Sequence, residues 1–169
     1  MRTAGVALAI ALALALQSTL TRFIVRGTVA VDLVLVVVVY VALLSGSVTG
    51  LLAGTVAGLL QDALGTSVIG IGGLAKTTVG FLAGIVGTQF IVARPLPRFV
   101  VFFVATLLHQ VITIGLGVIL GLRPFGAPYA VVAGQALGNA VVGVAAFQLV
   151  ELWPVAVERS RTARTRLRR

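Results

Sequence analysis

Six long apolar runs, separated by short polar or proline-containing stretches, divide the chain. They cover residues 4–20, 31–44, 48–64, 68–93, 99–122 and 129–153. A helix needs about 20 predominantly apolar residues to cross a bilayer, and five of these runs have 17–26 residues, whereas the run over residues 31–44 has 14. Residues 34–41 are rich in valine, but an isolated strand cannot satisfy its backbone hydrogen bonds in lipid. We therefore predict an all-α polytopic membrane protein, with a single six-helix transmembrane domain over residues 1–157.

The first apolar run has two interpretations. Arg2 followed by an alanine- and leucine-rich stretch also resembles a secretory signal peptide. Arg22 and Arg26 follow the run without a clear small-x-small cleavage site, which favours a retained helix. Polar loops are expected at residues 94–98 and 123–128, where prolines interrupt the apolar pattern.

Composition supports a membrane location and sets the expected orientation. Hydrophobic residues make up 59% of the chain and charged residues only 10%, whereas a soluble domain carries about 25% charged residues. Mean hydropathy is +1.16. The net charge of +9 is concentrated in a basic tail, residues 158–169, which contains six arginines. Basic residues favour the cytoplasmic side and bind anionic lipid. We therefore expect a cytoplasmic C-terminus and, after six crossings, a cytoplasmic N-terminus.

Small residues follow one face of each of the third and fourth runs. Gly50, Gly54 and Gly58 recur every four residues in the third run, and Gly80 and Gly84 continue the pattern in the fourth. Such stripes let helix backbones approach closely. We expect the two stripes to pack together as an antiparallel hairpin. In a protein that acts as a scaffold, small-residue faces of this kind would also hold the transmembrane helix of a partner.

Two ionisable residues lie within this hairpin, Asp62 at the end of the third run and Lys76 in the fourth. Charged groups are costly in hydrocarbon, so each needs a partner or a function. The connecting turn is short, so a pair between Lys76 and Asp62 is feasible, directly or through water. The pair could brace the hairpin or could form a partner or ligand site.

Four further polar residues lie in the last two runs: His109, Gln110, Gln135 and Asn139. Polar side chains in transmembrane helices commonly form interhelical hydrogen bonds. The alternative is that they line one central cavity together with Lys76. The chain has four acids, one histidine and no cysteine, and it contains no recognisable catalytic motif. We therefore predict no catalytic residue, no metal site and no cofactor, and expect that the protein is not an enzyme.

The stretch GLLQDALGTSVIGIGGLAKTTVGFLAG resembles the signature hairpin of the rod shape-determining MreD family. The matching positions are Gly58, Leu59, Leu60, Asp62, Gly65, Gly70, Lys76, Gly80, Phe81 and Gly84. Asp32 resembles a Pro-Asp element of that family, although Val31 stands in place of the proline.

The resemblance implies a non-enzymatic subunit of the cell-elongation machinery in the bacterial inner membrane. Its expected partners are the bitopic protein MreC and, indirectly, MreB filaments and the peptidoglycan polymerase and transpeptidase. The six-helix fold is also similar to the substrate-binding subunits of energy-coupling-factor transporters. The alternative function is therefore a small-molecule-binding subunit of a vitamin-type transporter. An aromatic content of only 7% favours the scaffold, because a vitamin pocket is expected to be richer in aromatic groups.

Overall fold

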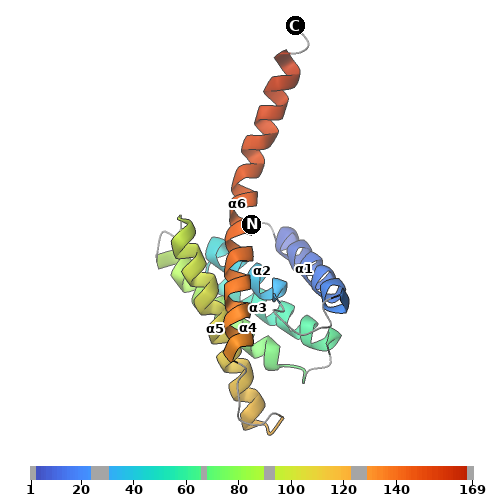
Figure 1. The fold of residues 1–169 in the computed structure, drawn as a ribbon, viewed down its shortest axis with the longest axis vertical. Helices are drawn as coiled ribbons and strands as arrows, with labels where there is room; N and C mark the ends of the chain where they lie inside the picture. The colour runs from blue at the N-terminus through green and yellow to red at the C-terminus, as the bar shows by residue number, and fades with distance from the viewer. Residues whose placement is uncertain (1–2, 24–30, 66–67, 90–93, 123–128, 167–169) are drawn as a thin grey trace.

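The computed structural model describes residues 3–23, 31–65, 68–89, 94–122 and 129–166. It describes only the backbone for residues 3, 20–23 and 152–166. The described residues form six helices: α1 (Thr3–Phe23), α2 (Leu33–Ser45), α3 (Ser47–Leu64), α4 (Ile71–Gln89), α5 (Pro95–Ile119) and α6 (Tyr129–Arg166) (Figure 1). Within the described residues, α3, α4, α5 and the first part of α6 are long and apolar enough to cross a membrane, and α1 and α2 contain shorter apolar segments. The chain is an all-α polytopic membrane bundle, as predicted.

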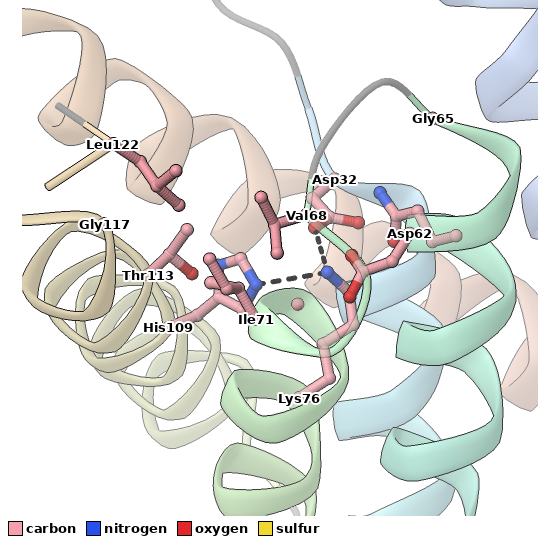
Figure 2. A pocket seen from close by; sticks show the side chains of 12 residues that line it. Asp32, Asp62, Gly65, Val68, Ile71, Lys76, His109, Thr113, Gly117 and Leu122 are labelled. Atoms are coloured by element: carbon pink, nitrogen blue, oxygen red, sulfur yellow. Dashed lines mark hydrogen bonds and ion pairs between the residues drawn. The ribbon is translucent and has the colours of Figure 1, made fainter. Parts of the chain in front are cut away.

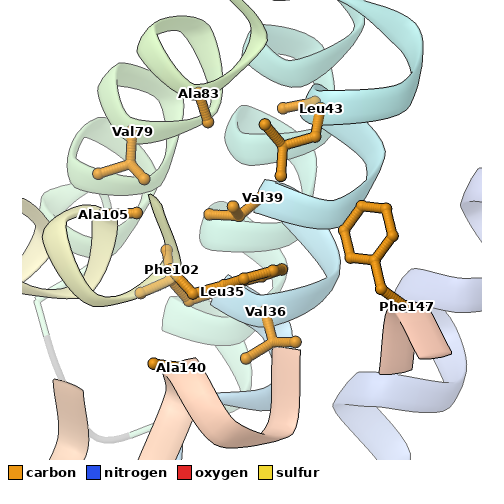
Figure 3. Close-up of a cluster of buried hydrophobic side chains, with 11 residues drawn as sticks. Leu35, Val36, Val39, Leu43, Val79, Ala83, Phe102, Ala105, Ala140 and Phe147 are labelled. Carbon is orange, nitrogen blue, oxygen red and sulfur yellow. The ribbon is translucent and has the colours of Figure 1, made fainter. Parts of the chain in front are cut away.

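Helix α2 is the centre of the bundle. It contacts each of the other five helices, and eight of its 13 residues are buried. A helix that is apolar on every side is suited to such a position. Its length of about 20 Å is shorter than the apolar thickness of a bilayer, which is about 30 Å. Figure 3 shows Leu35 and Val39 of α2 packed with Phe102 of α5, Ala140 of α6 and Val79 of α4.

The hairpin of α3 and α4 is the closest contact in the bundle, as the glycine pattern predicts. A Cβ atom added to Gly54 would overlap the backbone carbonyl of Lys76, and one added to Gly50 would overlap that of Gly80. At Gly58 the added atom would come within 2.6 Å of the Cα atom of Gly73. These glycines therefore hold α3 and α4 together. The expectation that the same faces hold a partner's helix is wrong, because the hairpin itself covers them.

The structure places the start of α5 and the end of α6 differently from the sequence pattern. Gly46, with a φ of 87°, is the single residue between α2 and α3, so a tight turn joins these two helices. Residues 94–98 were expected to form a loop, but α5 already begins at Pro95. Proline fits the first turn of a helix because its missing N–H would have no partner there. Helix α6 continues to Arg166, past the end of the apolar run at residue 153. The predicted loop over residues 123–128 lies outside the described residues.

Candidate functional site

Three side chains accept hydrogen bonds from backbone N–H groups at the buried start of α2. Asp32 precedes the helix, and its carboxylate accepts a hydrogen bond from the N–H of Leu35 at 2.9 Å. The N–H of Val34 donates to Gln17 of α1 at 3.2 Å, and the N–H of Asp32 donates to Asn139 of α6 at 2.9 Å. The first N–H groups of a helix have no partner within it. A helix that starts inside the bundle therefore needs acceptors from its neighbours, and α1 and α6 supply two of them.

Lys76, in the second turn of α4, joins the start of α2 to the middle of α5. Its Nζ lies 2.8 Å from Oδ2 of Asp32 and 3.1 Å from Nε2 of His109 (Figure 2). The side chains of Lys76 and Asp32 are only 3% and 6% exposed. An ammonium group donates hydrogen bonds and cannot accept them, so Nε2 of His109 is the acceptor. The imidazole is therefore neutral, with its proton on Nδ1.

The predicted pair between Lys76 and Asp62 is wrong, because each of these residues has a different partner. Oδ2 of Asp62 accepts hydrogen bonds from the N–H of Gly70 at 2.8 Å and of Gly73 at 3.1 Å. The carboxylate of Asp62, at the end of α3, therefore caps the start of α4, where a negative charge is favourable. Gly72 permits this contact, because a Cβ atom there would overlap Oδ1 of Asp62.

These charged groups line a cavity of about 420 Å³ at one end of the bundle (Figure 2). Its walls come from the start of α2, the end of α3, the start of α4 and the second half of α5. The lining residues are Asp32, Gln61, Asp62, Gly65, Val68, Ile71, Gly72, Lys76, His109, Thr113, Gly117 and Leu122. Three buried polar atoms of this lining have no hydrogen-bond partner among the described residues: Oε1 of Gln61, Nδ1 of His109 and Oγ1 of Thr113.

The sequence of almost the whole bundle matches one known protein family. A family model described as rod shape-determining protein MreD matches residues 2–153. The chain belongs to the MreD family. It is thus a multi-pass membrane protein of a family that determines rod shape. No curated protein and no solved structure matches it.

In this MreD-family protein, the predicted set of cavity residues is only partly correct. Lys76 and His109 line the cavity, whereas Gln110, Gln135 and Asn139 do not. Gln110 of α5 donates a hydrogen bond to Gln135 of α6. Nδ2 of Asn139 donates to Oγ1 of Thr106 at 3.1 Å. These three residues connect helices, which was the first interpretation of their polarity, and the alternative of a shared cavity lining is wrong for them.

The MreD-family bundle contains a second ion pair that the sequence did not reveal. Arg98, in the first turn of α5, forms a two-pronged pair with Glu151 of α6, and its Nη1 lies 3.0 Å from Oε2. The guanidinium also lies over the ring of Phe147, 4.4 Å from its centroid. Arg98 was assigned to a loop, so its burial was not expected. The two prolines before Arg98 could have indicated that a helix begins there, because proline is common in the first turn of a helix.

The carboxylates whose side chains are described each have a partner elsewhere in the bundle. Within the described residues, no three His, Cys, Asp or Glu side chains come together to hold a metal ion. Each acid whose side chain is described forms an ion pair or a hydrogen bond with a group on another helix or at the start of one. Asp32 joins α2 to α4, Asp62 joins α3 to α4, and Glu151 joins α6 to α5. The carboxylates of this MreD-family protein thus stabilise contacts between helices.

Proposed function

We propose that the protein is a non-enzymatic scaffold subunit of the bacterial cell-elongation complex. It binds an MreC-like bitopic protein and through it couples lateral peptidoglycan synthesis to cell-shape control. MreB-like filaments and the peptidoglycan polymerase and transpeptidase are indirect partners. The observation that carries this proposal is the family match, which covers residues 2–153 and hence almost the whole helical bundle.

The internal connections of the bundle support a role in holding shape. The three acids with described side chains each contact another helix, and the α3–α4 hairpin packs backbone against backbone. A rigid body of this kind can hold a partner in a fixed position. Because the glycine faces are already covered, the partner's transmembrane helix docks on the outer, apolar surfaces of the bundle.

We further propose that the protein lies in the cytoplasmic membrane with both termini in the cytoplasm. Nine basic residues are then inside: Arg2, Arg94, Arg98 and the six arginines of the tail. Three are outside: Arg22, Arg26 and Arg123. This asymmetry follows the positive-inside rule. In this orientation the tail contacts anionic lipid, and the cavity with Asp32 and Asp62 opens toward the periplasm, where an MreC-like partner has its soluble domain.

The test is the identity of the protein that co-purifies. The full chain, tagged and expressed in its own host, is extracted in a mild detergent, with an unrelated polytopic protein carrying the same tag as the control. We expect recovery of a single-pass protein with a periplasmic domain, and no such recovery with the control. Recovery of an ATPase-coupled transport module in its place contradicts the scaffold proposal.

One observation favours the second candidate, a small-molecule-binding subunit of a vitamin-type transporter. The cavity has three polar atoms without partners, as a ligand site would. Its described lining, however, contains no Phe, Tyr or Trp, the residues that an aromatic vitamin ring is expected to contact. The scaffold is therefore the better-supported function, and the same co-purification experiment separates the two.

A further inference from the structure

We propose that the cavity beside Lys76 binds an uncharged group that carries several hydroxyls, either a free polyol or sugar or the headgroup of a neutral lipid. Gln61, His109 and Thr113 are the residues that hold it. This inference goes beyond the scaffold function and does not depend on it, because a scaffold can bind its protein partner with the cavity empty or filled.

The unpartnered atoms are the first support for the site. Nδ1 of His109 carries a proton, because Nε2 accepts from Lys76, and yet Nδ1 donates to no atom of the described residues. His109 is only 7% exposed. Oε1 of Gln61 and Oγ1 of Thr113 are buried and unpartnered in the same lining. Buried polar groups are nearly always hydrogen-bonded, so three exceptions in one cavity indicate that something else satisfies them.

The chemistry of these atoms selects hydroxyl groups. Nδ1 of His109 needs an acceptor, Oε1 of Gln61 needs a donor, and the hydroxyl of Thr113 can serve either way. A hydroxyl group both donates and accepts, so a ligand with several of them satisfies all three. Figure 2 shows His109 and Thr113 on the α5 side of the cavity, facing Ile71 and Val68. These two apolar side chains provide a wall for the carbon skeleton of such a ligand.

The charges of the lining disfavour an anion, and the hydrogen-bonding groups left unpartnered in it do not suit a cation. Lys76 is neutralised by Asp32 at 2.8 Å, which leaves Asp62 as an additional negative charge. An anion would be repelled by this remaining negative charge. A cation would meet the N–H of His109, which cannot coordinate it, and the carboxylates of Asp32 and Asp62 already have partners in Lys76 and in the N–H groups of Gly70 and Gly73. An uncharged group is the class that these contacts favour.

The chain offers an unusual probe, because His109 is its only histidine. The full protein is labelled with ¹⁵N-histidine, carries a tag without histidine, and is placed in phosphatidylcholine nanodiscs, since glycoside detergents would compete. The imidazole signals are followed during titration with methyl glucoside and, separately, in nanodiscs that contain a glucosyl diacylglycerol. Glucose 6-phosphate and glucosamine are the anionic and cationic counterparts.

We expect a saturable shift of the Nδ1 signal with at least one neutral probe and a weaker response to both charged ones. A shift with the soluble probe alone assigns a free ligand, and a shift with the lipid alone assigns a headgroup. Thr113→Val should weaken binding about tenfold, because it removes one hydrogen bond to the ligand. Gln61→Met, of similar size, should weaken it to a similar extent.

Thr106→Val is the matched control. Thr106 lies on α5 two turns before Thr113 and is also buried, but it is hydrogen-bonded to Asn139 and does not line the cavity. This variant should lower the Tm and leave the response to the probe intact. The absence of a shift with either neutral probe overturns the proposal and leaves water as the content of the cavity. Unchanged binding in both Thr113→Val and Gln61→Met, or stronger binding of glucose 6-phosphate, also overturns it.

Discussion

Two ion pairs lie in different parts of the bundle and have very different surroundings. In the first, Lys76 and Asp32 are both almost fully buried and belong to the wall of the cavity. In the second, Arg98 is buried but the side chain of Glu151 is 56% exposed. The first pair joins the central helix α2 to α4, and the second joins α5 to the outer helix α6.

This difference shows that the two pairs have different requirements. A carboxylate that remains exposed can exchange its partner for water, whereas a buried one cannot. The charge on Asp32 therefore requires Lys76, but Glu151 does not require Arg98 to the same extent. Disruption of the first pair should affect the centre of the bundle, while disruption of the second should affect only one helix contact.

The largest effect is expected from Lys76→Met. This substitution leaves the Asp32 carboxylate buried without a counter-charge, which costs about 3–5 kcal/mol of unfolding free energy. The measurement is denaturant titration in mixed micelles. Asp32→Asn in the same chain should restore most of the loss, because asparagine is neutral and still caps a helix. No recovery in the double variant would show that the cost does not come from the unpaired charge.

A smaller effect is expected from Gly54→Ala, which acts on the same pair through the backbone. The added methyl group would overlap the carbonyl of Lys76, so α3 and α4 must separate. We expect a loss of about 2 kcal/mol, in the range of overpacked cores. Gly115→Ala is the control, because a Cβ atom at Gly115 meets nothing within 4 Å. It should leave stability unchanged or raise it by up to about 1 kcal/mol. Equal losses in both variants would contradict a specific close contact at Gly54.

The smallest effect is expected from Arg98→Met. Glu151 then becomes hydrated, and methionine retains part of the packing against Phe147. The melting temperature should fall less than in Lys76→Met. Raised salt should weaken the Arg98 pair in the unmodified protein and leave the Lys76 pair nearly unaffected, because buried charges are poorly screened. If raised salt lowered the melting temperature of Arg98→Met by as much as it lowers that of the unmodified protein, the Arg98–Glu151 pair would not be the source of the salt dependence.

Much of the fold follows from the sequence pattern. The six apolar runs and the spacing of Gly50, Gly54 and Gly58 depend on helical periodicity, which is local, and the structure confirms the helices and the hairpin. The start of α5 was predicted less well, because the two prolines that suggested a loop also fit the first turn of a helix.

The partners of the polar residues could not be predicted in the same way. Asp62 was assigned to Lys76 because the two are close in the chain, but the start of α4 competes for its carboxylate. The partner found in the structure, Asp32, is 44 positions before Lys76 and comes near it only because α2 is central. Two signals were present: the uniformly apolar sequence of α2 and an acid directly before it. Together they place a buried, helix-capping carboxylate inside the bundle.

The most direct test of this account is a pair of double-mutant cycles that share one variant. Lys76→Met is combined with Asp32→Asn in one cycle and with Asp62→Asn in the other, and unfolding free energies are measured for all single and double variants. We expect a coupling of about 2–3 kcal/mol between Lys76 and Asp32, and near-additive effects, within about 0.5 kcal/mol, for Lys76 and Asp62. Strong coupling with Asp62 and additivity with Asp32 would contradict the arrangement of charges described for this bundle.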